Sequence, residues 1–407
     1  MKPSLRPVLG LISLVLLTLI PQGCRPPGSR HHPLELGFWN GFSGPDGKTM
    51  EGIVHRFNLE HPGIQVRMQI IPWGTYYDKL TLGLAYGGAP DVFILHESRV
   101  AEYASHDALA PMNDLPGIDR KDFVEKAWQV GLWKGRRFGL PLDCHPLGMY
   151  YNTDLFERAG IARPPATLAE FIEDGKRLTH DGQWGFSMTD IHLVGSTFLY
   201  QFGANLLNPD FTRSALESPE SNQAVETLLS FSDKEKISPP PQGNDAWMGF
   251  QMGRVGMVFQ GTWMVESLDH QKDLRYAVAP VPSFGPIRAV WAGSHTLCMP
   301  ATISPERRRA AITFIAYLSE HSLDWAKGGQ VPVRLSILHS PDFAKLKIMR
   351  VFAEELPYIH YEPFAVTANQ VAPFADSAID AALNHVDAPA PLLRAAARRI
   401  DNVLRRQ

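Results

Sequence analysis

An alternation of short apolar strands and amphipathic helices between residues 34 and 95 constrains the fold of this chain most strongly. LELGFW at 34–39, GIQVRMQII at 63–71 and DVFIL at 91–95 have the composition of strands. One helix follows the loop NGFSGPDG and ends at His61, and a second occupies TYYDKLTLGLAYGG. This order predicts a parallel sheet with crossover helices, and therefore the α/β fold class.

The middle and the end of the chain predict a second α/β unit. WGFSM and VGMVF have the composition of strands, and TLAEFIEDGKRL begins with Thr167 and Glu170 in capping-box spacing. SPERRRAAITFIAYLSE offers Ser304 as an N-cap with Pro305 in the first turn, and LLRAAARRIDNVL is a further amphipathic helix. A length of 407 residues fits a chain of two domains or two lobes.

The N-terminus has the features of an export signal. An apolar run at residues 8–20 follows two basic residues and falls short of the roughly 20 residues that span a bilayer. Residues 1–23 are therefore predicted to be a signal peptide. Cys24 directly follows the run, as in a bacterial lipobox, and is predicted to carry a lipid. Pro21 and Gln22 depart from the lipobox pattern, which leaves cleavage by an ordinary signal peptidase nearby as the alternative.

Charge and cysteine content narrow the classes of protein that remain. Removal of residues 1–23 changes the net charge from -3 to about -5, which gives no electrostatic reason to expect a nucleic-acid partner. Cys144 and Cys298 are predicted to be buried free thiols. Residues 24–33 are a polar, proline-rich tether. Its His31 and His32 lack a second ligand pair at a metal-binding spacing, so no metal site is predicted.

The loop after the first strand comes close to a phosphate-binding motif. GFSGPDGKT ends in Gly47, Lys48 and Thr49, but the P-loop pattern requires glycine at the position of Phe42. Nucleotide binding is therefore not expected, and no cofactor is predicted. A loop at the carboxyl end of such a strand remains a place where α/β sheets bind ligands.

A set of motifs in a fixed order resembles the family 1 extracellular solute-binding proteins of bacterial ABC importers. The likeness covers nearly all of residues 34–407, and no single motif carries it. The matching segments are YYDKL, APDVF, PLDCHPLGMYYNTDLFERAGI, PPATLAEFIEDGKRLT, GRVGMVFQGTWMV, APVPSFG, WAGSHTLCMP, AAITFIAYLSE and GGQVPVR.

The resemblance implies two α/β lobes joined by hinge segments, with a ligand cleft between them. Crossovers are expected at the proline-marked runs near Pro141 and Val281. Lobe one is then 34–141 plus 282–320, and lobe two is 145–278 plus 321–407. The resemblance further implies a monomeric, non-enzymatic binding protein that delivers a small molecule to an ABC permease. We expect it outside the cytoplasm, held to the membrane by the lipid on Cys24, in a periplasm or on the outer cell surface.

Sugar binding requires flat rings for the apolar faces of the ligand and polar groups for its hydroxyls. The resemblance carries over four tryptophans as stacking candidates, although each has partly buried core as its alternative: Trp39, Trp73, Trp263 and Trp291. Trp247 is a further candidate with a hydrophobic helix face as the alternative. The polar candidates are Ser43, Glu97, Asp143, Ser294, His295 and Arg334. The two acids have helix capping or ion pairing as alternatives.

The expected function is therefore capture of a carbohydrate or polyol. A secreted glycosidase is one rival, because Glu97 and Asp143 could imitate its pair of acids. A phosphorylated polyol such as glycerol phosphate is another, because Arg334 and His295 suit a phosphate. A polyamine would need several acids around an aromatic box, and a metal is a further alternative ligand.

Overall fold

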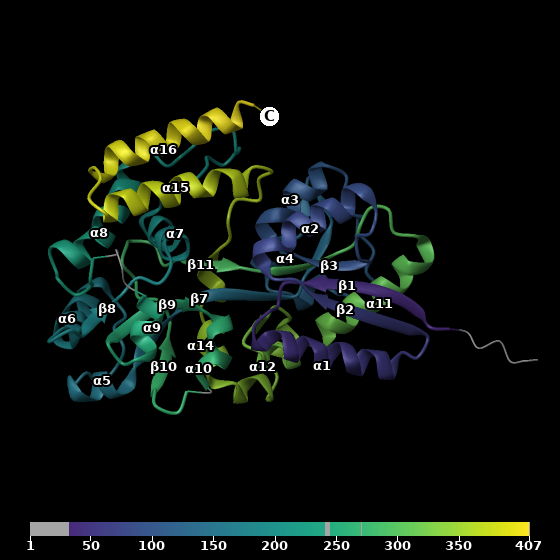
Figure 1. Cartoon of the computed structure of the whole chain (residues 1–407), viewed down its shortest axis with the longest axis horizontal. Helices are drawn as coiled ribbons and strands as arrows, with labels where there is room; N and C mark the ends of the chain where they lie inside the picture. The colour runs from purple at the N-terminus through teal and green to yellow at the C-terminus, as the bar shows by residue number, and fades with distance from the viewer. Residues whose placement is uncertain (1–31, 241–244, 270, 407) are drawn as a thin grey trace, which may run out of the picture.

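The computed structural model describes residues 32–240, 245–269 and 271–406. Within this part of the chain there are two lobes, each built on its own sheet and covered by helices (Figure 1). The predicted signal peptide, Cys24 and His31 lie outside the described residues. None of the described helices is long and apolar enough to cross a membrane.

The first lobe is built on a five-stranded sheet in the order β2-β1-β3-β12-β6. β1 pairs in parallel with both β2 and β3, as the alternation predicts, and β12 pairs antiparallel with β3 and β6. The strands are β1 (Leu34–Asn40), β2 (Ile64–Ile70), β3 (Val92–His96), β6 (Gly139–Pro141) and β12 (His295–Cys298). The helices are α1 (Pro45–Glu60), α2 (Trp73–Tyr86), α3 (Glu97–Ser105), α4 (Glu125–Gln129), α11 (Pro305–Glu320) and α12 (Ser322–Lys327), with a small β4 (Leu132–Trp133) and β5 (Arg136–Arg137) pair.

The second lobe is built on a seven-stranded sheet around one long strand, β7 (Asp143–Asn152). β7 pairs with β9, β10, β11 and β13, and nearly all of its residues are buried because partners surround it. The other strands are β8 (Trp184–Phe186), β9 (Val255–Gly261), β10 (Tyr276–Ala279), β11 (Val290–Gly293), β13 (Val331–Pro332) and β14 (Ile359–His360).

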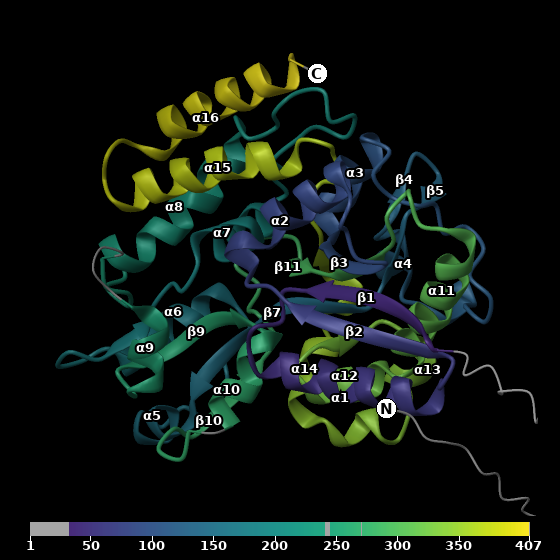
Figure 2. The ribbon, with the colours of Figure 1, turned by 45° about the vertical axis from the view of Figure 1, so that its right-hand side comes forward.

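Helices of several lengths cover this second sheet. They are α5 (Thr153–Arg158), α6 (Leu168–Leu178), α7 (Ile191–Phe202), α8 (Pro219–Asp233), α9 (Ala246–Gln251), α10 (Val265–Asp269), α14 (Lys347–Ala353), α15 (Ala368–Leu383) and α16 (Pro389–Leu404). The short α13 (Leu335–Leu338) instead begins beside Asp122 and Phe123 of the first lobe. Short 3-10 turns occur at η1 (Arg120–Asp122), η2 (Thr262–Met264), η3 (Phe343–Lys345) and η4 (Leu356–Tyr358). Figures 1 and 2 show α15 and α16 side by side at the outer end of the lobe.

Several local predictions are confirmed. Thr167 and Glu170 form both hydrogen bonds of a capping box at the start of α6, and the Ser304 side chain caps α11. Cys144 and Cys298 are buried and free. The α/β class and the two-lobe architecture are also as predicted.

The passages between the lobes differ in part from the predicted limits. The first lies at Leu142, between β6 and β7, within the predicted run. The second lies at Ser294 rather than near Val281, because β11 still pairs with β7 and β14 of the second sheet. Residues 282–293 therefore belong with the second lobe. α12 packs on α1 of the first lobe, so residues 322–327 do not follow the predicted division either.

Candidate ligand cleft

A cavity of about 490 Å³ lies where the two lobes meet. It opens at the carboxyl ends of β1 and β3, the edge at which α/β sheets bind ligands. Residues of both lobes line it: Gly41, Ser43, Gly44, Pro45, Asp46, Trp73, His96, Glu97, Ser98, His145, His192, Leu193, Trp263, Met264, Ser267, Trp291, Gly293, His295, Gln330 and Glu362.

Three of the five predicted tryptophans, Trp73, Trp263 and Trp291, line this cavity. The ring of Trp73 stacks parallel to that of His295, with 5.9 Å between centroids and 7° between planes. Trp291 comes from β11, and Trp263 follows β9 in η2. The apolar faces of the cavity are therefore supplied by rings from both lobes.

Two glycines make room for these rings. A Cβ added to Gly41 would lie 2.1 Å from the Trp73 ring, and one added to Gly261 would lie 2.0 Å from the Trp263 ring. Such distances are far inside van der Waals contact, so a larger residue at either glycine would displace the indole.

Trp39 and Trp247 do not line the cavity. Trp39 packs against a separate cluster of the first lobe, with the ammonium of Lys79 4.6 Å from its ring centroid. Trp247 packs on Tyr150 and Phe250, at centroid distances of 5.9 and 5.8 Å. The observed packing fits the alternative of partly buried core for Trp39 and that of a hydrophobic helix face for Trp247.

Glu97 lines the cavity as the first residue of α3 and is buried. Its Oε2 accepts a hydrogen bond of 2.7 Å from the backbone N–H of Ser294, and its own N–H donates to the Ser294 carbonyl. Burial is the main cause that raises the pKa of Glu97 to about 8. Near pH 7 this carboxyl is therefore largely protonated, a form that can donate a hydrogen bond to a ligand.

Asp143 lies beneath the cavity rather than on its surface. It is fully buried, and Oδ2 accepts from Nε1 of Trp325 at 2.6 Å and from Nδ1 of His295 at 2.8 Å. Oδ1 accepts from the His295 backbone N–H at 2.9 Å and lies 3.3 Å from Nδ1 of His145. Burial would raise the pKa of this carboxyl, but His295 and the hydrogen bonds lower it below its usual range. Asp143 therefore orients two histidines that line the cavity.

Of the remaining polar candidates, two line the cavity and two do not. Ser43 and His295 line the cavity. Ser294 is buried at the passage between the lobes, where its Oγ donates to the Asp143 carbonyl at 2.6 Å. Arg334 lies away from the cavity in an ion pair of 2.8 Å with Asp122. Arg334 follows shortly after a strand, as residues of a ligand cleft often do, but its guanidinium pairs with Asp122 and does not line the cavity.

Sequence reasoning missed several cavity residues, above all His96, His145, His192 and Glu362. His192 lies 2.6 Å from Glu362 and 3.1 Å from Asp376. Burial disfavours its charged form, but these carboxylates raise the pKa of His192 to about 11, so the ring is cationic at pH 7. His96 could have been found as a polar residue that directly ends the buried strand β3.

Two lobes that enclose a cavity at their crossovers are the architecture of a protein that closes around a small molecule. The family comparison agrees: the chain belongs to the bacterial extracellular solute-binding proteins, whose family model matches residues 52–351. Family membership therefore confirms the resemblance seen in the sequence motifs.

Three similar proteins illustrate the family. The arabinooligosaccharide-binding protein of Bacillus subtilis is 25% identical, over 79% of this chain and 76% of its own. The sn-glycerol-3-phosphate-binding periplasmic protein of Shigella flexneri is 28% identical, over 73% of this chain and 74% of its own. An ABC substrate-binding protein from Listeria monocytogenes, with a structure in complex with cycloalternan, is 22% identical in sequence. Its structure matches with a TM-score of 0.80, over 91% of this chain and 99% of that one.

Proposed function

We propose that this protein captures a carbohydrate in the cleft between its lobes, outside the cytoplasm, and delivers it to an ABC permease. The observation that carries the proposal is the set of indole rings, Trp73, Trp263 and Trp291, that face one cavity from two lobes. Such rings stack on the C–H faces of a sugar, while Ser43, Glu97 and other polar groups can pair with its hydroxyls. Similarity to an arabinooligosaccharide-binding protein supports the same ligand class.

Closure of the lobes supplies the link to delivery. A ligand that contacts both lobes favours the closed state by its differential affinity for that state. Trp73 belongs to the first lobe, and Trp263 belongs to the second. A sugar held between them would therefore stabilise the closed form that a permease recognises.

The test is a titration of intrinsic tryptophan fluorescence in the purified protein with mono- and oligosaccharides, glycerol phosphates and polyamines. We expect a saturable change with one sugar and a loss of affinity of about tenfold or more in Trp263→Ala, because a stacked ring contributes roughly 1.5–3 kcal/mol. Trp247→Ala is the matched control, since that ring lies outside the cavity. Equal affinities of Trp263→Ala and Trp247→Ala would contradict the proposed site.

A phosphorylated polyol is the second candidate ligand. The cationic ring of His192 lines the cavity, and a relative 28% identical is named for sn-glycerol-3-phosphate. Arg334, which first suggested this ligand, is bound by Asp122 elsewhere. A response to glycerol phosphate alone that is lost in His192→Gln would establish this candidate and exclude the sugar.

The glycosidase reading is not favoured. A glycosidase holds its two acids across the scissile bond, whereas Asp143 lies under the floor of the cavity and is engaged by His295 and Trp325. Incubation with the oligosaccharide that binds, followed by analysis for shorter products, tests this point directly.

We also propose that Cys24 carries a lipid that anchors the protein to the membrane. The support is the apolar run that ends just before this cysteine, together with membership of an extracellular family. Membrane fractionation of Cys24→Ser is the test. Loss of the protein from the membrane fraction is expected, and its retention there would contradict the anchor.

A further inference from the structure

Three histidine rings meet at the floor of the cleft. His96 ends β3, His145 lies in β7 and His295 begins β12. Their centroids are 4.5 Å apart for His145 and His295, 5.2 Å for His96 and His295, and 6.2 Å for His96 and His145. One ring nitrogen of each lies within 4.8 Å of one ring nitrogen of the other two.

Sheet register places these rings together. His295 is the direct antiparallel partner of His96, and His145 is the partner of Gly293. A Cβ at Gly293 would lie 2.2 Å from Nε2 of His145, so glycine is required there for the ring to occupy its place. The convergence is therefore fixed by backbone pairing at the passage between the lobes.

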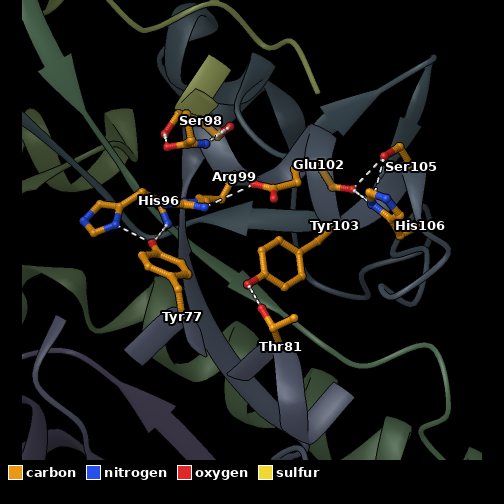
Figure 3. Close-up of polar contacts among 10 residues, drawn as sticks. Tyr77, Thr81, His96, Ser98, Arg99, Glu102, Tyr103, Ser105 and His106 are labelled. Carbon is orange, nitrogen blue, oxygen red and sulfur yellow. Dashed lines mark hydrogen bonds and ion pairs between the residues drawn. The ribbon is translucent and has the colours of Figure 1, made fainter. Parts of the chain in front are cut away.

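Each ring is also held through its Nδ1. Asp143 contacts Nδ1 of His295 at 2.8 Å and Nδ1 of His145 at 3.3 Å, and the Tyr77 hydroxyl lies 2.6 Å from Nδ1 of His96 (Figure 3). Histidines that bind a metal characteristically give their other nitrogen to a carboxylate or another oxygen in this way. A metal bound to the other nitrogen of a ring would leave that ring's Nδ1 contact in place.

We propose that His96, His145 and His295 form a three-imidazole site for a divalent transition-metal ion such as Zn²⁺, with an open coordination position toward the cleft. Imidazole is a preferred ligand of Zn²⁺, Ni²⁺ and Cu²⁺, and three histidines with one open position is a known zinc arrangement. Zinc lies about 2.0–2.1 Å from each nitrogen, so the rings would move closer together on binding.

The open position faces a cavity that Trp73 and Trp263 also line. An oxygen or nitrogen atom of the captured molecule could complete the coordination while its carbon faces contact these rings. The metal site itself does not depend on the proposed function, but this part of the inference rests on it. The alternative is that the three rings only donate hydrogen bonds to the ligand.

The experiment uses untagged protein, stripped with a chelator and titrated with Zn²⁺ by calorimetry in a buffer that does not bind metal. One equivalent per chain is expected, and His145→Gln and His295→Gln should each weaken the affinity at least 100-fold. His339→Gln is the matched control, because that histidine is exposed and outside the cleft. Co²⁺ supplies a second readout, since four-coordinate Co²⁺ absorbs strongly in the visible range. Thermal melting checks that each variant is folded.

Absence of stoichiometric Zn²⁺ uptake, or equal affinity in His145→Gln and His339→Gln, would overturn the metal site. Asp143→Asn adds a readout for the positioning role, with a weakening of about 10- to 100-fold expected. Sugar titrations of stripped and Zn²⁺-loaded protein separate the two proposals. Sugar binding without metal uptake would support the proposed function and overturn the metal site. Metal uptake without a response to any sugar would support the metal site and contradict the proposed function.

Discussion

The floor and the walls of the cleft are built on different principles. The floor consists of polar side chains on paired strands, where His295 lies opposite His96 and Asp143 connects two rings from below. The walls consist of indole rings at the start of α2, in η2 and in β11, and neighbouring glycines make space for two of them. Strand register therefore determines the floor, whereas local steric space determines the walls. We expect substitutions in the floor to affect stability most and those in the walls to affect binding most.

Removal of Asp143 should have the largest effect. Asp143→Ala leaves Nε1 of Trp325 and the backbone N–H of His295 without their acceptor in a fully buried place. Loss of one partner from a buried charged network costs about 3–5 kcal/mol. Chemical denaturation should show a fall of that size in the free energy of unfolding. The control is Asp342→Ala, an exposed acid paired with Lys345, for which little change in the free energy of unfolding is expected because water screens the pair. Similar losses of unfolding free energy in the two variants would contradict the view that Asp143 holds the floor together.

Gly261→Ala tests the wall. The added methyl group would collide with the Trp263 ring, so we expect the ring to move and the affinity for the ligand to fall about tenfold, while the unfolding free energy falls by about 1–3 kcal/mol. Ligand titration and denaturation of the same sample measure both quantities. Gly74→Ala in α2 is the control, because nothing lies within 4 Å of its Cβ position and the change should be neutral or stabilising. Unchanged affinity in Gly261→Ala would show that Trp263 does not touch the ligand.

His192 is a partly exposed residue that lines the cavity from the second lobe. Its substitution should have the smallest effect on stability. The pKa of its ring is about 11 in the folded state, against about 6.5 when unfolded. The stabilisation is therefore fully present below pH 6.5 and is lost as the pH rises toward 11. Because the ring is partly exposed, we expect His192→Gln to cost about 1–2 kcal/mol at pH 6.

Denaturation at pH 6, 8 and 9.5 measures this dependence. The difference between the wild-type protein and His192→Gln should shrink steadily over that range. A difference that stays constant or grows with pH would mean that the ring is not held as a cation by Glu362 and Asp376.

The features that could be predicted from the sequence are those that depend on residues close together along the chain. Periodicity identified β1 to β3 and their helices, and local capping patterns identified the starts of α6 and α11. The proline-rich run near Val281 resembles a crossover, but the actual second passage follows the four-residue strand β11.

Side-chain direction explains the errors in the site. Trp39 and Trp247 have suitable residue types, but strand face and helix packing direct them elsewhere. The histidines of the floor escaped detection because they are far apart along the chain and only long-range strand pairing brings them together. A motif search by spacing cannot find such a group.

The passages at Leu142 and Ser294 have a mechanical consequence. Ser294 Oγ donates to the Asp143 carbonyl, and the third connection, from α12, enters β13, which pairs with Cys144 and Asp143 of β7. The connecting segments therefore lie together at one hinge, which we take as the axis of lobe rotation. Displacement in a rotation grows with distance from the axis, so lobe rotation would move the rims of the cleft far more than its floor. A short molecule seated on the floor would then be gripped at a small angle of rotation, and a longer one would hold the lobes further apart. The angle at which the lobes come to rest would thus report the length of the captured molecule.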